Sequence, residues 1–115
     1  MLLKLKNISL IAIILISSAA HNAHANQFTA KDFLEFSQGQ RQWWYMGSID
    51  ALGLVVSQGN KEQADCIWNW YFADKDAKSA FLDKKMKSFP QHSPSAIITG
   101  LLHKDCGKFS VKGAE

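Results

Sequence analysis

The sequence is poor in the residues and motifs that usually reveal an activity. It holds two cysteines and two prolines among 115 residues, and this length leaves room for one small domain. It contains no glycine-rich phosphate loop, no GxSxG elbow, no CxxC pair and no HExxH motif. The short length excludes two-domain enzymes and repeat arrays. The balance shifts from catalysis to binding, and we expect neither enzymatic activity nor a cofactor.

The first 25 residues have the pattern of a secretory signal peptide. Lys4 and Lys6 precede an apolar stretch over residues 8–16, in which Ser9 is the single polar residue, and Ala23-His24-Ala25 offers a cleavage site, with cleavage after Ala20 as the alternative. The apolar stretch is too short to remain as a membrane anchor. We therefore expect an exported protein in which residues 26–115 form the folded domain.

Neither sign of charge is in clear excess once the expected signal peptide is set aside. The chain has 13 basic and 10 acidic residues, so the loss of Lys4 and Lys6 leaves 11 bases against 10 acids and a net charge of about +1. Such a balance does not attract nucleic acid or anionic lipid. We expect neither as a partner.

Both cysteines lie in the part of the chain that is expected to be exported. Cys66 and Cys106 are 40 residues apart, and paired thiols are the rule in oxidising compartments. We predict a disulfide between them. Closing a loop of this size stabilises the folded state by roughly 2–4 kcal/mol, mostly by restricting the unfolded chain.

The apolar pattern predicts a first short helix and a long central one. Thr29 and Asp32 form a helix start, and this helix is expected to end near residues 37–39. Residues 40–57 carry apolar side chains almost all round a helix, which predicts a central helix that is buried on most sides. Gly59 and Asn60 are expected to stop it.

The second half of the chain predicts further short helices. Residues 66–72 are interpreted as a turn that leads into a helix, with Asp74 and Asp76 in its first turn and lysines in its last. Ser93 and Pro94 predict the start of the last helix, which closes at Cys106. The expected fold is an all-α, single-domain bundle of four to five short helices with one disulfide.

Two irregular segments are the candidates for binding a partner. The polar stretch over residues 57–65 and the turn over residues 89–94 are the longest such segments, and loops carry recognition more often than packed faces do. Ordinary solvated linkers are the alternative. The candidate partner-binding residues are Ser57, Gln58, Gly59, Asn60, Lys61, Glu62, Gln63, Gln91 and His92.

Other chemistry has weaker support. His103, Asp105 and Cys106 resemble a nucleophile with its base, but a disulfide sulfur cannot act as a nucleophile. A metal site built from His92, His103 and Asp105 matches no regular ligand spacing, so we predict none. A cluster of aromatic residues is interpreted as core, with stacking on saccharide rings as the alternative: Trp68, Trp70, Tyr71 and Phe72.

The order and spacing of several motifs resemble the Rap/Tai immunity proteins of type VI secretion systems. The motifs are Tyr45-x-Gly47-x-x-Asp50-Ala51, Cys66 after a polar loop, Phe89-Pro90 at a helix end, and a helix from Ser95-Ala96 to Leu101 that closes at Cys106. The resemblance implies a periplasmic protein that binds a secreted peptidoglycan-cleaving amidase and plugs its active-site groove with a protruding loop. It also implies a homodimer. Residues 57–63 are then the expected inserted element, and residues 89–94 are the second choice.

A second class remains open at this point. Periplasmic acid-stress chaperones of the HdeA type are also exported, helical and held by one disulfide, and residues 29–36 resemble their opening helix. Their acid switch relies on many carboxylates, whereas the ten acidic residues here form no obvious cluster. The chaperone is therefore kept as the alternative function.

Overall fold

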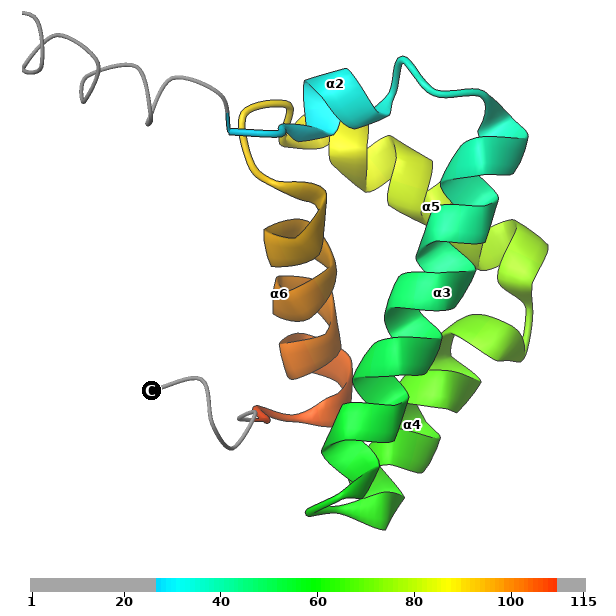
Figure 1. Cartoon of the computed structure of the whole chain (residues 1–115), viewed down its shortest axis with the longest axis vertical. Coiled ribbons are helices and arrows are strands. Elements are labelled where there is room, and N and C mark those ends of the chain that lie inside the picture. The colour runs from blue at the N-terminus through cyan, green and yellow to red at the C-terminus, as the bar shows by residue number, and fades with distance from the viewer. Residues whose placement is uncertain (1–26, 110–115) are drawn as a thin grey trace, which may run out of the picture.

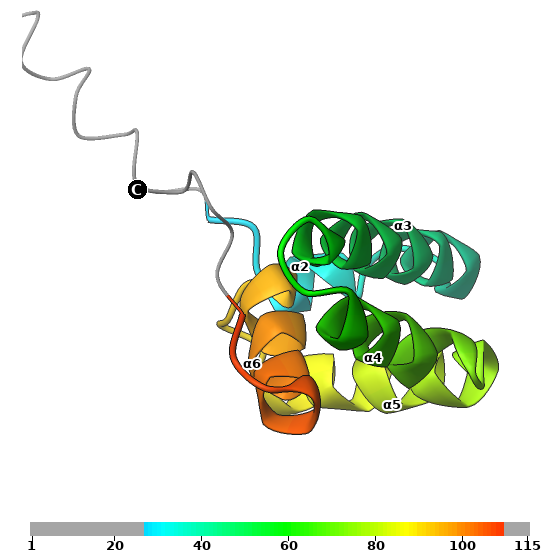
Figure 2. The ribbon, with the colours of Figure 1, turned by 90° about the horizontal axis from the view of Figure 1, so that it is seen from below.

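The computed structural model describes residues 27–109, and this range contains five helices and no strand. The helices are α2 (Ala30–Phe33), α3 (Gln38–Ser57), α4 (Lys61–Phe72), α5 (Lys75–Ser88) and α6 (Pro94–Cys106). α3 and α4 run side by side in opposite directions (Figure 1). Seen along the bundle, α4 lies between α3 and α5, and α6 covers the side that α4 and α5 share (Figure 2). The predicted all-α bundle is confirmed, whereas the predicted signal peptide lies outside the described residues.

Each helix begins at a polar side chain that accepts a hydrogen bond from a backbone N–H three residues later. The capping residues are Thr29, Ser37, Asn60, Asp74 and Ser93. At Thr29 and Ser37 the bond is reciprocated, because the side chain three residues on accepts from the backbone of the cap. The predicted starts at Thr29 and Ser93 are confirmed.

Two predicted boundaries are wrong. α3 begins at Gln38, because Ser37 and Gln40 cap it, and not near residue 40 after a helix that runs to residue 39. Residues 66–72 are not a turn, since they form the second half of α4. Asn60 looks like a helix stop in the sequence, but its side chain starts α4 by accepting from the Gln63 backbone at 3.0 Å.

The expectation that α3 is buried on most sides is also wrong. Only one stripe of α3 is buried, and Trp43 on another side is 73% exposed. α4 covers one face of α3, residues of α2 and α5 contact its first turns, and much of the remaining surface meets solvent. The buried core consists of Ala30, Phe33, Tyr45, Ile49, Val56, Ala64, Ile67, Tyr71, Leu82, Met86, Ile97, Ile98 and Leu102.

The closest approach between α3 and α4 occurs at Gly53. A Cβ atom at this position would lie 2.2 Å from the indole nitrogen of Trp68. That nitrogen donates to the Asp50 backbone carbonyl at 3.3 Å, so the N–H edge of the indole faces α3. Gly53 is therefore required by packing, whereas a Cβ at Gly47 would meet nothing within 4 Å.

A partly buried polar cluster joins α3 to α5. Arg41 donates to both carboxylate oxygens of Asp83, at 3.0 and 2.9 Å, and the Tyr45 hydroxyl donates to the same carboxylate at 2.8 Å. The bond to Asp83 raises the pKa of Arg41. Burial, reinforced by the hydrogen bond to Asp83, raises the pKa of Tyr45 well above its ordinary value. Arg41 therefore stays protonated and Tyr45 stays neutral at physiological pH, and the cluster holds α3 against α5.

The predicted disulfide is confirmed. Cys66 and Cys106 are bonded, with their Cα atoms 5.8 Å apart. The bond joins the middle of α4 to the last residue of α6. It therefore fixes where the chain leaves α6 and passes the end of α3.

Candidate functional site

The segment favoured for partner binding is a tight helical turn and not an irregular loop. α3 continues to Ser57 and α4 begins at Lys61, so only Gln58, Gly59 and Asn60 connect them. The N–H groups of Gly59 and Asn60 both donate to the Val56 carbonyl. The expectation of an irregular segment over residues 57–65 is therefore wrong, because helix capping extends both helices into it.

The predicted residues have different roles within this turn. The Ser57 hydroxyl is committed to its own helix, since it donates to the Leu54 carbonyl at 2.6 Å. Gln58, Gly59 and Asn60 are exposed, and so are Lys61 and Glu62 in the first turn of α4. The Gln63 amide donates to three backbone carbonyls, those of Cys106, Gly107 and Lys108, at 3.0–3.2 Å.

This turn borders a hollow on the surface of the molecule. The hollow has a volume of about 360 Å³ and is lined by Val55, Val56, Gln58, Gly59, Asn60, Gln63, Lys108 and Phe109. We call it the groove, and we call this end of the molecule the turn end. Four of the nine predicted binding residues line the groove: Gln58, Gly59, Asn60 and Gln63.

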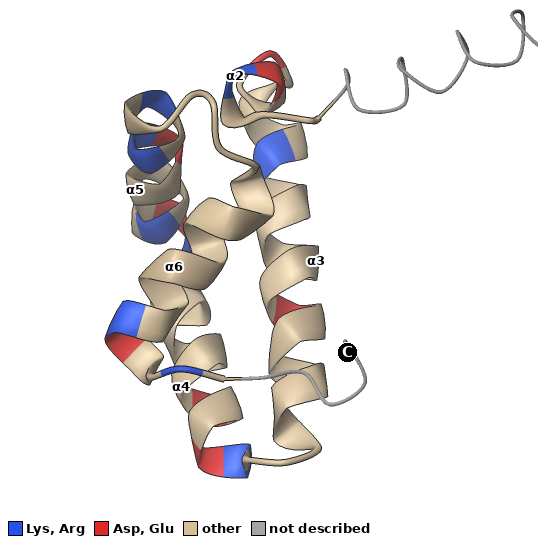
Figure 3. Cartoon of the chain, turned by 90° about the vertical axis from the view of Figure 1, so that its left-hand side faces the viewer, with Lys and Arg blue, Asp and Glu red and all other residues tan. Residues whose placement is uncertain are grey.

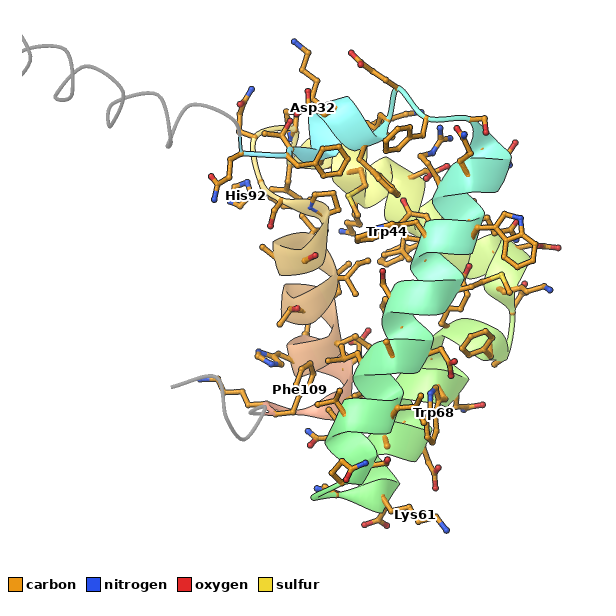
Figure 4. All side chains as sticks on the ribbon, viewed as in Figure 1. Asp32, Trp44, Lys61, Trp68, His92 and Phe109 are labelled. Atoms are coloured by element: carbon orange, nitrogen blue, oxygen red, sulfur yellow. A yellow bond between two sulfur atoms is a disulfide. The ribbon has the colours of Figure 1, made fainter. Side chains whose placement is uncertain are left out.

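One wall of the groove comes from the chain that follows α6. Gln63 holds the backbone of this segment, and the disulfide fixes the residue from which it starts. Phe109 packs its ring against His103, with ring centres 4.4 Å apart. Phe109 and the turn residue Lys61 lie toward the same end of the molecule (Figure 4). The groove is thus formed by segments that are far apart in the sequence.

The second predicted segment lies at the opposite end of the molecule. Gln91 and His92 belong to the turn between α5 and α6, where His92 lies near Asp32 of α2 (Figure 4). We call this the α2 end. The His92 carbonyl accepts from the Ala30 N–H at 2.7 Å, and the Pro90 carbonyl accepts from the Lys31 N–H at 3.0 Å. The structure therefore does not unite the two predicted binding segments, and the backbone of the turn at the α2 end packs on α2 while the side chains of Gln91 and His92 are exposed.

Four residues of the groove were not predicted as site residues. Val55 and Val56 were assigned to the buried helix, and Lys108 and Phe109 follow the last predicted helix without any motif. Val55 is 43% exposed, which the apolar pattern of α3 does not indicate. The disulfide and the bonds from Gln63 help to bring Lys108 and Phe109 into place, and of these the bonds from Gln63 are not evident from local sequence.

The geometry gives little support to a catalytic cysteine, a metal site or a saccharide-binding cluster. Cys106 is bonded to Cys66, so it is not a free nucleophile. Over residues 27–109 no three His, Cys, Asp or Glu side chains are grouped so that they could hold a metal ion. Of the aromatic cluster, Tyr71 is buried, Trp68 covers Gly53, and Trp70 has the Lys78 ammonium 4.2 Å from its ring centre.

The lining of the groove carries little charge. Lysines and acidic residues gather on α5, on α2 and at the helix ends, while long stretches of α3 and α6 carry no charge (Figure 3). Within the groove lining, Lys108 is the only charged residue. The groove thus combines apolar side chains, three carboxamides and one cation.

Comparison with protein-family models, with curated proteins and with solved structures found no match to this chain. Among the described residues, no helix has both the length and the apolar character needed to cross a membrane. The candidate site therefore rests on its own geometry.

Proposed function

We propose that this protein is an exported, periplasmic inhibitor that binds a secreted peptidoglycan amidase and occludes its active site. The motifs that resemble the Rap/Tai immunity proteins suggest this partner. The observation that carries the proposal is the groove at the turn end, where exposed polar side chains surround an apolar floor on a stiff frame. Such a surface fits recognition of another protein better than it fits catalysis.

Stiffness of the turn end supports tight binding. The disulfide, the Asn60 cap and the three bonds from Gln63 hold the groove in one shape before a partner arrives. Preorganisation lowers the ordering cost of association. In this proposal the inhibitor needs no catalytic group of its own, since it acts by covering the amidase's substrate cleft.

The proposal is tested by capture followed by inhibition. The disulfide-bonded protein is used as bait for secreted proteins of the source organism at neutral and at acidic pH, and each partner is then assayed for cleavage of purified peptidoglycan. We expect one cell-wall amidase that binds in a 1:1 ratio at neutral pH and loses activity when the protein is added. An amidase that binds but keeps full activity would contradict the proposal.

The capture experiment at acidic pH distinguishes the alternative function from the inhibitor. A chaperone of the HdeA type would bind many unrelated proteins, and only at low pH. Light scattering of the same sample measures whether the protein is a homodimer, as the resemblance implies. A broad set of acid-dependent partners, without any amidase at neutral pH, would replace the inhibitor by the chaperone.

A further inference from the structure

The lining of the groove specifies the chemistry of what binds there. Its floor is apolar, because Val55, Val56 and the ring of Phe109 line it. Val56 is only 6% exposed and belongs to the core, whereas Val55 is 43% exposed and offers its side chain to a partner. A hollow of about 360 Å³ is at the lower end of the range for small-ligand sites. It has room for one or two side chains and not for a helix.

The hydrogen-bonding groups of the rim are only partly used by the fold. Asn60 uses its carbonyl oxygen to cap α4, and Gln63 uses its amide nitrogen to hold the chain after α6. The Asn60 amide nitrogen, the Gln63 carbonyl oxygen and the Gln58 side chain make no hydrogen bond within residues 27–109. These groups can pair with the backbone of an extended segment, which offers both donors and acceptors.

The charge of the groove has one sign. Lys108 lines it, no carboxylate does, and Lys108 forms no ion pair with any described residue. Glu62 lies in a separate shallow depression beside the disulfide. A carboxylate placed in the groove therefore meets an ammonium group and amide donors, while an incoming cation meets like charge.

We infer that the groove binds an extended partner segment in which an apolar side chain is followed by a carboxylate. The apolar side chain rests on Val55 and Phe109, the carboxylate pairs with Lys108, and the segment's backbone bonds to Gln58 and Asn60. The identity of the partner as an amidase rests on the proposed function. The recognised chemistry does not, because it follows from the lining alone.

Three capped tetrapeptides with glycine at both ends test this inference on the disulfide-bonded protein. Their central residues are leucine–glutamate, leucine–lysine or serine–glutamate. Binding is followed by NMR, through the side-chain amide signals of Gln58 and Asn60 and the backbone signal of Gly59. We expect the leucine–glutamate peptide to bind about tenfold more tightly than either other peptide, and its binding to weaken as salt is raised.

Two matched pairs of variants locate the contacts. Lys108→Glu should reverse the preference, so that the leucine–lysine peptide binds more tightly, while Lys104→Glu, an exposed change outside the lining of the groove, should keep the original order. Val55→Asp should lower the affinity at least about tenfold. Leu54→Asp, a neighbour that is 55% exposed and does not line the groove, should leave the affinity unchanged.

Several results would overturn the inference. Equal binding of the three peptides, or shifts confined to residues around Trp43, would show that the groove does not recognise this chemistry. Signals that change with protein concentration alone would assign the groove to a second copy. A variant ending at Phe109 that binds peptides when the full chain does not would assign it to residues 110–115. An amidase that is inhibited equally by wild type and Val55→Asp would overturn this inference while leaving the proposed function intact.

Discussion

The two ends of the bundle both contain a turn rich in polar residues, yet the fold uses them differently. At the α2 end, the turn between α5 and α6 gives two backbone carbonyls to the first residues of α2. Rings of Phe28, Phe33, Phe36 and Trp44 pack together beside it. At the turn end, the fold leaves the side chain of Gln58 and part of Asn60 without partners among the described residues. Polar composition therefore does not distinguish the two turns, whereas their backbone hydrogen bonds do, because only the turn at the α2 end gives its carbonyls to another helix.

Removal of the disulfide is expected to have the largest effect on stability and to loosen the turn end more than the α2 end. The double variant Cys66→Ala, Cys106→Ala should lower the free energy of unfolding by about 2–4 kcal/mol. Hydrogen exchange should rise most in the last turn of α6 and in the Gln63 region, and least in α2, because the bond acts at the turn end. Urea denaturation and exchange mass spectrometry measure both effects. An equal rise at the two ends would show that the disulfide does not hold the groove locally.

Two of the three glycines of α3, Gly47 and Gly53, provide a test of intermediate size. Gly53→Ala places a Cβ against the Trp68 indole and should destabilise the protein by about 1–3 kcal/mol. Gly47→Ala meets no atom and should stabilise it by about 0.5–1 kcal/mol, since alanine favours the helix. Thermal denaturation of both variants gives the comparison. If both changes stabilised the protein, the close packing of α4 on α3 would be refuted.

The smallest expected effect is a pH dependence at the α2 end. The Thr29 N–H donates to the Asp32 carboxylate at 3.0 Å, and this bond, together with the bond from the Thr29 hydroxyl, lowers the pKa of Asp32 below its ordinary value of 3.8. A carboxyl whose pKa is lowered by folding stabilises the folded state at any pH above its pKa in the unfolded chain. This stabilisation is lost as the pH falls through its pKa in the folded protein. The effect is small because Asp32 is exposed. NMR titration of Asp32 should give a midpoint below 3.8, and in Thr29→Ala it should rise.

Much of the fold was predictable from local signals. The caps at Thr29 and Ser93 and the pairing of the two cysteines follow from residue types whose physical role is the same in most proteins. Asn60 shows the limit of such signals, because asparagine suits both the end of one helix and the start of the next. Spacing of only three residues between the helices favours the second role here.

The site was predictable only in part. The polar residues of the turn end were recognisable as candidates for binding, and four of them line the groove. The pattern of α3 did not distinguish Val55, which is exposed, from Val56, which is buried, because both are apolar neighbours on one helix. Lys108 and Phe109 join the groove through contacts with residues more than forty positions earlier, and no periodicity encodes such contacts.

The central claim is that the groove at the turn end is the surface that binds the partner. A bulky residue at Gly59 tests it most directly, because a Cβ there meets no atom within 4 Å and Gly59 lacks the positive φ that would strain one. Gly39→Trp is the matched control, since Gly39 also has open space and lies at the other end of α3, roughly 28 Å away at 1.5 Å per residue. In titrations of the captured amidase, Gly59→Trp should abolish inhibition at unchanged thermal stability while Gly39→Trp inhibits like wild type. Full inhibition by Gly59→Trp would contradict the account.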